Sequence, residues 1–506
     1  MDQSKPSFFI TTPIYYVNAD PHLGTAYSTI IADVQARYRR SAGYNVKFLT
    51  GMDEHGEKVA EAAAKHNMTP QEWTDSQAPH FKELWNKLEI SNDDFIRTTE
   101  PRQHHAVQYL WERMKESGYL YKGSYDGWYC VPDETYFTDT QVQKGDEEYG
   151  SVGQHLCPDC HRPLERVQEE SYFFKLSAFQ DKLLKLYDEH PDFVEPAFRM
   201  NEVRSFVEGG LNDLSVSRTS FDWGIQVPFD EGHVTYVWFD ALLNYMTAVG
   251  YGVDTDEARA ELAYRWPAQF HIVGKDIIRF HCVIWPAMLM AIGEALPEHV
   301  FAHGFLTVRN AETGKAEKMS KSRGNVINPN DVVAQYGADT MRLYIMFIGD
   351  FEKAAAWSDN AVKGCKRFLD RVWNLAENLT EEAGCSKANE SAVHKTIKKV
   401  SDDIEAMKFN TAIAALMGLL NEIYAKGSIT KDELIIYIKL LCPIAPHLCE
   451  EIWESLGGDG FLSMAKWPVY DEAKTMDATV EVGVQVNGKL RSVVALPANC
   501  DKEEAF

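Results

Sequence analysis

Residues 8–38 read FFITTPIYYVNADPHLGTAYSTIIADVQARY. The apolar run at 8–10 predicts a short strand, and a turn-rich stretch follows as far as Gly24. Beyond it, apolar residues recur at helical spacing: Tyr27, Ile30, Ile31, Val34 and Tyr38. The segment therefore predicts a strand, a loop and a helix in direct succession.

The same alternation continues downstream. A second strand is expected at 46–49, and the loop 51–56 leads into another helical segment. Repeated strand-helix units favour a parallel sheet with ligand sites at the strand ends. Short β-type segments from about Gly118 to Ser171 then interrupt the pattern, before strand signals return at 234–238 and 269–273. We therefore expect a β-rich insertion within the sheet.

The last third of the chain changes character. Its pattern is almost entirely helical from about Ala354 to Leu456, which predicts a separate helical domain. Alternating valines at 480–486 then precede Asn487-Gly488, and apolar residues follow at 490–494. This arrangement predicts a β-hairpin with a tight turn.

Length, composition and charge narrow the class of protein. A chain of 506 residues predicts about three or four domains. The sequence lacks an apolar run of 18 residues and a signal-like start, and its nine cysteines fit reduced thiols, so we expect a cytoplasmic protein that does not bind membranes. The net charge of -24 has the wrong sign for global attraction to nucleic acid. An RNA partner must meet a local basic patch, and the candidates are Lys363, Lys366, Arg367 and Arg371, or Lys395, Lys398 and Lys399.

Two motifs suggest nucleotide chemistry. Pro21-His22-Leu23-Gly24-Thr25 lies where a helix begins after a strand, so backbone N–H groups and His22 can face phosphate oxygens. About 300 residues later, Lys318-Met319-Ser320-Lys321-Ser322 forms a cationic loop suited to a triphosphate. Alone, the first motif is more often a helix start with a solvent-exposed histidine, and the second is more often solvated surface. The presence of both motifs in this order indicates that they belong to one nucleotide-binding site.

The two motifs together resemble the HIGH and KMSKS signatures of class I aminoacyl-tRNA synthetases. This resemblance implies a Rossmann-type parallel-sheet catalytic domain split by a β-rich insertion and followed by an α-helical bundle domain. It implies that His22, Thr25, Lys318 and Lys321 act in catalysis, and that ATP binds to His22, Gly24, Thr25, Gly274, Lys275, Asp276 and residues 318–322, including Met319, Ser320 and Ser322. Thr25 stands where the family often has a second histidine, which puts the role of that position in doubt.

The expected boundaries follow from the patterns and the resemblance together. They are 1–117 and 231–300 for the two halves of the catalytic domain, 118–230 for the insertion, 301–354 for the region of the KMSKS-type loop that contacts the tRNA stem, 355–474 for a helical tRNA- and anticodon-binding domain, and 475–506 for a β-hairpin tail.

A wider match, over residues 8–350, resembles methionyl-tRNA synthetases. It rests on TTPIYY at 11–16, GMDEHG at 51–56, YVWFDA at 236–241, and GKDI at 274–277 with His281 and Trp285. Trp238, Ala241, Leu242 and Tyr245 have helical spacing, and so do Ile277, His281 and Trp285, so each set can line one helical face. Such a face is core packing in most proteins, but here it would form an aromatic pocket suited to a thioether. The resemblance places the amino acid against Pro13, Ile14, Tyr16, Asp53, Trp238, Ala241, Leu242, Tyr245, Ile277, His281 and Trp285, with Asp53 on its ammonium group.

The activity implied is methionine-tRNA ligation by way of methionyl-adenylate, with ATP, Mg²⁺ and tRNA(Met) as partners and a monomer as the working state. Methionyl enzymes of this type also often carry a zinc knuckle in the insertion. Here Cys157 and Cys160 form an intact Cys-x-x-Cys pair, while the other element reads Cys130-Val131-Pro132-Asp133. Three thiolates and a carboxylate can bind Zn²⁺, with His155 or His161 as alternative ligands, and a site held by packing without metal is the competing interpretation.

The resemblance weakens in the helical domain. Asn374 and Asn378 match an anticodon-reading element of the family, but Glu382 replaces its arginine, and the segments 356–373 and 486–489 resemble leucyl-tRNA synthetases. A leucine-type enzyme is disfavoured because the insertion is too short for its editing domain. Two further hypotheses are an inactive synthetase-like RNA-binding module and an ATP-dependent ligase that adenylates a small acid without tRNA.

Overall fold

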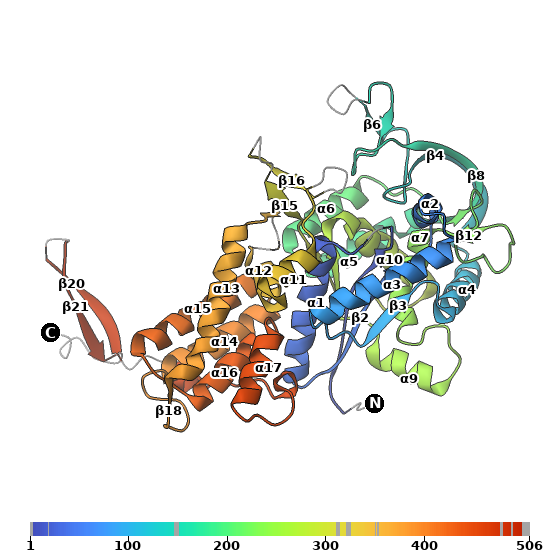
Figure 1. Cartoon of the computed structure of the whole chain (residues 1–506). Helices are drawn as coiled ribbons and strands as arrows, with labels where there is room; N and C mark the ends of the chain where they lie inside the picture. The colour runs from blue at the N-terminus through green and yellow to red at the C-terminus, as the bar shows by residue number, and fades with distance from the viewer. Residues whose placement is uncertain are drawn as a thin grey trace. The chain divides into compact units, whose positions relative to one another are not determined.

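The computed structural model of the chain describes residues 4–18, 20–145, 151–309, 314–319, 325–349, 351, 354–475, 479–486 and 489–497 (Figure 1). The chain divides into two compact units. The first comprises Met1–Arg39, Gly43–Val332 and Phe351–Trp357, and the second comprises Arg40–Ala42, Val333–Asp350 and Ser358–Phe506.

A six-stranded parallel sheet forms the centre of the first unit. Its strand order is β3-β2-β1-β13-β14-β9. The strands are β1 (Ser7–Tyr16), β2 (Asn45–Asp53), β3 (Asp94–Arg97), β9 (Val194–Glu195), β13 (Phe270–Gly274) and β14 (His299–His303). The expected strands at 8–10 and 46–49 are confirmed, and both are longer than expected because their apolar residues are buried over most of their length. Strand order reverses between β1 and β13, which is where ligands bind in open α/β sheets.

The first crossover explains the sequence pattern at the start of the chain. Helix α1 (Leu23–Ser41) follows β1, and its apolar residues are buried as the helical spacing predicted. Helices α2 (Glu57–Lys65), α3 (Pro70–Lys87) and α4 (Pro101–Glu116) come after β2 and β3. The start of α3 is fixed by a capping box, in which Thr69 and Glu72 each accept a hydrogen bond from the other's backbone N–H.

The β-rich insertion lies where the sequence predicted an interruption. Its sheet has the order β10-β8-β4-β5, built on the long antiparallel pair β4 (Leu120–Cys130) and β8 (Glu165–Phe174), with β5 (Thr135–Phe137) and β10 (Leu214–Ser215) at the edges. Two small strands, β6 (Gln143–Lys144) and β7 (His155–Leu156), pair separately. Helices α5 (Gln180–Glu189) and α6 (Ala197–Glu208) follow, and β9 between them joins the main parallel sheet beside β14.

The chain returns to the main sheet through irregular helices. α7 (Val237–Ala241) and α8 (Asn244–Thr247) are separated by a turn, and hydrogen bonds such as Leu242 N to Trp238 O carry the helical path across it. After α9 (Asp256–Arg265) and β13, the backbone passes through a 3₁₀ turn (η2, Lys275–Ile277), a π-helical segment (η3, Phe280–Ile284) and α10 (Trp285–Ile292). The two expected helical faces therefore exist, but neither is one regular α-helix.

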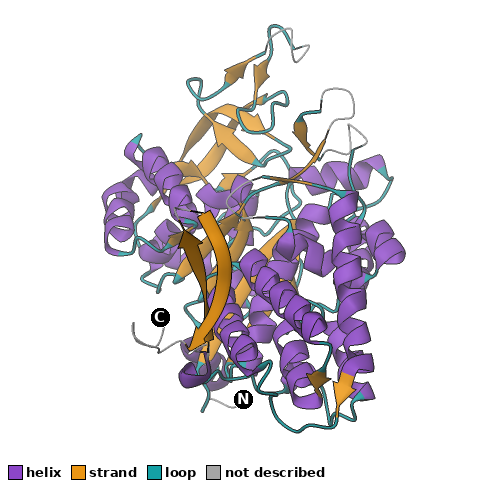
Figure 2. Cartoon of the chain, turned by 90° about the vertical axis from the view of Figure 1, so that its left-hand side faces the viewer, coloured by secondary structure: helices purple, strands orange, loops and turns teal. Residues whose placement is uncertain are grey.

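The second unit is helical, as expected (Figure 2). Its main helices are α12 (Ala338–Phe347), α13 (Asp359–Trp373), α14 (Glu390–Glu405), α15 (Phe409–Lys426), α16 (Lys431–Leu441) and α17 (Pro446–Ser455). The buried Arg342 guanidinium donates hydrogen bonds to the carbonyl oxygens of Pro443 and Ile444, which ties α12 to the end of α16. The expected hairpin is confirmed as β20 (Thr479–Val486) paired with β21 (Lys489–Pro497). None of the helices that the structure describes is long and apolar enough to cross a membrane.

Gly51 provides a test of the β2–β3 pairing. A Cβ atom at this position would lie 2.0 Å from the backbone oxygen of Ile96 on β3. We expect Gly51→Ala to lower the free energy of unfolding by about 2 kcal/mol or more, because backbone atoms cannot rotate away from the clash. Thermal unfolding measures the change.

Gly418→Ala in α15 is the matched control. Nothing lies within 4 Å of a Cβ atom at Gly418. Alanine is favoured over glycine inside a helix, so this control should be neutral or stabilising by up to about 1 kcal/mol. Equal stability of both variants and the wild type would contradict the β2–β3 register.

Candidate active site

Three parallel strands end at one edge of the sheet and carry the candidate residues. His22 follows β1, Asp53 ends β2, and Gly274 ends β13. Because β1 lies between β2 and β13, the two segments that follow β1 and β13 are brought together at the reversal of strand order.

The His22 turn presents an imidazole at the start of α1. His22 Nδ1 accepts hydrogen bonds from the backbone N–H groups of Gly24 at 3.1 Å and Thr25 at 3.4 Å. Nδ1 is therefore the acceptor, and the ring proton resides on Nε2. Thr25 is buried, and its hydroxyl oxygen accepts from the His22 backbone N–H at 3.4 Å. Thr25 thus holds the turn that orients His22.

The segment after β13 has a close-packed geometry. A Cβ atom at Gly274 would lie 2.5 Å from Asp276 Oδ1, so a larger residue there would displace the Asp276 carboxylate. The Lys275 ammonium lies 4.5 Å from the ring centre of Phe305. Lys318 ends β16 (Ala316–Lys318), whose backbone pairs with β15 (Leu306–Arg309), and Met319 follows it. Ser320, Lys321 and Ser322 lie outside the described residues.

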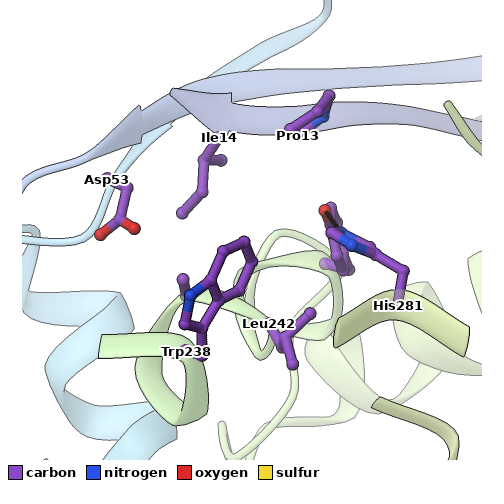
Figure 3. A pocket seen from close by; sticks show the side chains of 8 residues that line it. Pro13, Ile14, Asp53, Trp238, Leu242 and His281 are labelled. Carbon is purple, nitrogen blue, oxygen red and sulfur yellow. Dashed lines mark hydrogen bonds between the residues drawn. The ribbon is translucent and has the colours of Figure 1, made fainter. Parts of the chain in front are cut away.

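A pocket lies beside these strand ends, between β1, the end of β2 and the helices that precede and follow β13 (Figure 3). Eight of the eleven residues expected to contact the amino acid line it: Pro13, Ile14, Asp53, Trp238, Ala241, Leu242, Tyr245 and His281. The other three pack next to it: the Tyr16 ring is perpendicular to Trp238, Ile277 contacts His281 through its carbonyl, and Trp285 packs on Tyr245. The structure therefore brings the whole expected set together.

One end of the pocket is polar but uncharged. The His281 Nδ1–H donates to the carbonyl oxygen of Ile277 at 3.0 Å, so His281 Nε2 accepts the hydrogen bond from the Tyr245 hydroxyl at 2.7 Å. Burial lowers the pKa of His281 to about 4. Behind it, His271 Nε2 accepts from the Trp285 indole N–H, and burial together with His281 holds the pKa of His271 well below its usual value.

The other end carries the Asp53 carboxyl group, which forms no ion pair with any residue that the structure describes. Asp53 is buried, and its Oδ1 atom has no hydrogen-bond partner among the described residues. Burial raises the pKa of Asp53 well above its usual value, and the negative charges of Asp240, Glu134 and Glu54 raise it further. The Tyr16 hydroxyl and the Trp238 indole nitrogen are also buried without partners among the described residues. The Asp53 carboxyl group and the Tyr16 hydroxyl oxygen can accept hydrogen bonds and are suited to a small cationic ligand group, whereas the Trp238 indole N–H can only donate.

A second cluster lies in the insertion and has the composition expected from the sequence. One ligand atom each from Cys130, Asp133, Cys157 and Cys160 lies within 4.8 Å of the others. Cys130 Sγ is 3.6 Å from Cys160 Sγ and 3.5 Å from an Asp133 oxygen, and Cys157 Sγ is 3.2 Å from the same oxygen. Tetrahedral Zn²⁺ with Zn–S bonds of about 2.3 Å holds its sulfur donors about 3.6 to 3.8 Å apart, which matches the Cys130–Cys160 separation, and small shifts of the other side chains would complete the coordination.

The remaining candidate ligands do not belong to this cluster. His155 stacks on Trp128 with ring centres 4.2 Å apart, and His161 Nδ1 contacts Gln143 at 2.9 Å. All the cysteines that the structure describes are free thiols.

Sequence reasoning missed several residues of the site. His271, which packs on Tyr245 with ring centres 4.2 Å apart, was one of them, although a histidine within the apolar strand 270–273 was a visible signal. Glu134, next to Asp133, and the buried pair of His55 and Asp240 were also missed. Their partners are distant in sequence, so only the fold reveals them.

Comparisons with known proteins support the geometry. The family described as tRNA synthetases class I (M) matches residues 8–378, and the one described as anticodon-binding domain of tRNA ligase matches residues 387–505. The methionine–tRNA ligase of Thermotoga maritima is 53% identical over 339 residues, covering 67% of this chain and 51% of that protein. The methionine–tRNA ligase of Halalkalibacterium halodurans is 39% identical over 513 residues, which cover 92% of this chain and 75% of that protein. The chain thus spans about half the length of the first of these relatives.

Solved structures give the same relationship. Mycobacterium tuberculosis methionyl-tRNA synthetase bound by methionyl-adenylate aligns with a TM-score of 0.81 and 34% identity, covering 98% of this chain and 99% of that one. A LeuRS of Agrobacterium radiobacter K84 in complex with tRNA aligns with a TM-score of 0.83 and 16% identity, covering 99% of this chain and 91% of that one. At this identity the likeness is one of fold alone.

The low pKa of His281 predicts acid sensitivity. Because the pKa falls from 6.5 to about 4 on folding, the unfolded chain binds a proton between these pH values that the folded chain does not. The free energy of unfolding should therefore fall as pH drops through this window, by up to about 3 kcal/mol for His281. Thermal unfolding at a series of pH values measures it. His281→Gln should show a shallower fall, whereas parallel curves for both proteins would refute a neutral His281.

Proposed function

We propose, because this chain belongs to the class I tRNA synthetases of type M, that it activates methionine with ATP and transfers the methionyl group to the 3' end of tRNA(Met). The observation that carries this proposal is the pocket, which joins an unpaired carboxylate to an uncharged aromatic cavity. Its two ends match the two ends of methionine.

The Asp53 carboxylate would bind the α-ammonium group. Its Oδ1 atom lacks a partner in the described part of the chain, and an ammonium group would supply both the missing hydrogen bond and the counter-charge. The side chain would extend past Ile14 and Trp238 towards Tyr245 and His281. A thioether suits that end, because it is apolar, polarisable and makes favourable contacts with aromatic rings.

The nucleotide would bind across β1 and β13. The N–H groups at the start of α1 and the Nε2–H group of His22 would face the phosphates, while Gly274, Lys275 and Asp276 would contact the nucleoside. By the family resemblance, Lys318 and Lys321 would bind the triphosphate; Lys321 lies outside the described residues. ATP would enter with Mg²⁺, which neutralises phosphate charge.

The chemistry proposed needs no protein nucleophile. A methionine carboxylate oxygen attacks the α-phosphorus, the new P–O bond gives the adenylate, and the bond to pyrophosphate breaks. A terminal hydroxyl of the tRNA then attacks the carbonyl carbon and AMP leaves. His22 and the backbone N–H groups stabilise negative charge on phosphate as it builds, and Asp53 fixes the amino acid for in-line attack. Thr25 contributes by holding the His22 turn, since its hydroxyl is already bonded to the backbone.

The tRNA would bind the second unit through a basic surface of α13. Lys398 is paired with Glu472 and Lys399 with Asp403, so the cluster on α14 is largely neutralised. On α13, Lys366 is likewise paired with Asp370, but Lys363 and Arg367 are exposed on one helical face, so we favour this helix. We further propose that the enzyme works as a cytoplasmic monomer.

The second proposed ligand is Zn²⁺ at Cys130, Asp133, Cys157 and Cys160. Bound there, the ion would cross-link the turn at 130–133 to the turn at 157–160 and stabilise the insertion. The close approach of four buried or half-buried donors supports this role, since a carboxylate packed against thiols is otherwise unfavourable.

Pyrophosphate exchange tests the substrate assignment. We expect exchange that depends on methionine and exceeds that with leucine by at least about a hundredfold, followed by charging of tRNA. Asp53→Asn should weaken methionine use by about a hundredfold, because a charge-assisted bond is lost. Strong leucine dependence would assign a leucine-type enzyme. Exchange without charging would assign a ligase that does not use tRNA. If the protein showed neither exchange nor charging, an RNA-binding module would be the remaining interpretation.

Metal analysis tests the second ligand. We expect the purified protein to contain about one Zn²⁺ per chain, and Cys157→Ser to lose it together with thermal stability, because a thiolate ligand is removed. Cys385→Ser is the matched control and should keep the metal. A protein without Zn²⁺, whose unfolding temperature does not respond to added Zn²⁺ or to a chelator, would refute the site.

A further inference from the structure

A buried pair of charged or polar side chains lies behind the Asp53 carboxylate. His55 Nδ1 is 2.7 Å from Asp240 Oδ2, and both side chains are almost fully buried. The Asp240 carboxylate and backbone oxygen each accept a hydrogen bond from the Gln103 amide at 2.8 Å. Asp240 is thereby held on two sides, and neither of these residues lines the pocket.

The pair joins two walls of the pocket. His55 lies two residues after Asp53, and Asp240 belongs to α7, which also carries Trp238 and Ala241. The His55 backbone N–H faces the Asp53 carboxyl group and lowers its pKa. The hydrogen bond between the His55 imidazole and Asp240 therefore holds the His55 backbone N–H in place beside Asp53. It ties this group to α7, the helix that faces Asp53 across the pocket.

The rest of the loop is held by contacts of its own. Glu54 is fully buried, and its carboxylate accepts from Arg97 Nε at 2.6 Å while its backbone N–H donates to Thr98. Trp223 donates its indole N–H to the Glu54 carbonyl at 2.6 Å, and its ring packs against His55. Glu54 is thus tied to β3 and to the loop that follows it, and among the described residues His55 is the side chain of 53–56 that forms a hydrogen bond with α7.

We propose that the His55–Asp240 pair is a positioning device for Asp53, which sets how tightly the pocket binds the ammonium group of the amino acid. A buried pair of this kind is a poor way to stabilise a fold, because desolvation offsets much of the attraction. Such a pair is well suited to fix the direction in which the groups attached to it point. The inference rests on the proposed function, since it assigns the ammonium group to Asp53.

Two methionine analogues separate positioning from a general structural role. Methioninol keeps the ammonium group and lacks the carboxylate, whereas 4-(methylthio)butanoate keeps the side chain and carboxylate and lacks the ammonium group. Binding of each to the whole protein can be followed by tryptophan fluorescence, because Trp238 lines the pocket.

His55→Leu removes the imidazole but retains its bulk. We expect the dissociation constant of methioninol to rise by about tenfold or more, and that of 4-(methylthio)butanoate to stay within about twofold. The KM for ATP should also stay within about twofold. His55→Asn places an amide near the position of Nδ1 and should restore most of the affinity for methioninol.

His105→Leu is the matched control. His105 also uses one ring nitrogen, because its Nε2–H donates to the Gly252 carbonyl oxygen at 2.8 Å, but it is exposed on α4. The His105→Leu protein should bind both analogues as tightly as the wild type does. If His55→Leu does not fold, Asp240→Asn, which keeps the shape and removes the charge, should give the same selective loss of methioninol.

The outcomes are distinguishable. Equal weakening of both analogues, or of ATP as well, would make the pair a structural tie and overturn the inference, as would unchanged binding of methioninol. A wild-type protein that shows no methionine-dependent exchange would instead remove the proposed function itself.

Discussion

The Asp53 carboxylate is buried among other acids and opposite aromatic rings, its Oδ1 atom has no hydrogen-bond partner in the part of the chain that the structure describes, and the arrangement of the pocket depends on it. Burying a charge without a partner is costly, and three further carboxylates raise the pKa of this one. The fold tolerates the cost because the end of β2 is held by its neighbours: Gly51 lies against Ile96, and Glu54 is bonded to Arg97. A cationic ligand removes the penalty, so the unfavourable term in the empty protein becomes part of the binding free energy.

The parallel sheet supplies the rest of the geometry. Parallel strands place their carboxyl ends at one edge, and the reversal of order between β1 and β13 opens that edge to a ligand. The His22 turn, Asp53 and Gly274 belong to three different crossovers, yet they meet because of strand order alone. The pocket is then closed by the irregular helices on either side of β13, whose turns and π-helical segment aim Trp238, Tyr245 and His281 inward.

Much of this could be predicted from local pattern. The spacing of Trp238, Ala241, Leu242 and Tyr245 predicted a shared face, and the hydrogen bonds across the turn between α7 and α8 preserve it. The four metal-ligand candidates meet as the Cys-x-x-Cys spacing suggested, although Cys130 and Cys157 are 27 positions apart along the chain. The β9 strand could not be predicted, because two residues carry no periodicity.

The polar layer behind the pocket was beyond sequence reasoning for a different reason. His55 and Asp240 are 185 residues apart, and His271 meets Thr11 over 260 residues. A single histidine or aspartate has many partners available to it, and only the folded chain selects one. Apolar spacing predicts which face of an element is buried, but it carries no information about which buried polar groups satisfy each other.

The insertion is part of the pocket's support and not only an appendage. Glu134, next to the metal-ligand candidate Asp133, is fully buried, and its carboxylate accepts the Lys58 backbone N–H at 3.0 Å. The Lys58 ammonium donates to the Pro132 carbonyl at 2.7 Å and lies over the Tyr16 ring. One turn of the insertion therefore contacts α2 and, through Lys58, supports the aromatic ring beside Trp238. A Cβ atom at Gly56 would lie 2.7 Å from the Glu134 carboxylate, so the glycine that follows His55 is what lets this turn approach. Two sites with separate chemistry thus share a common wall.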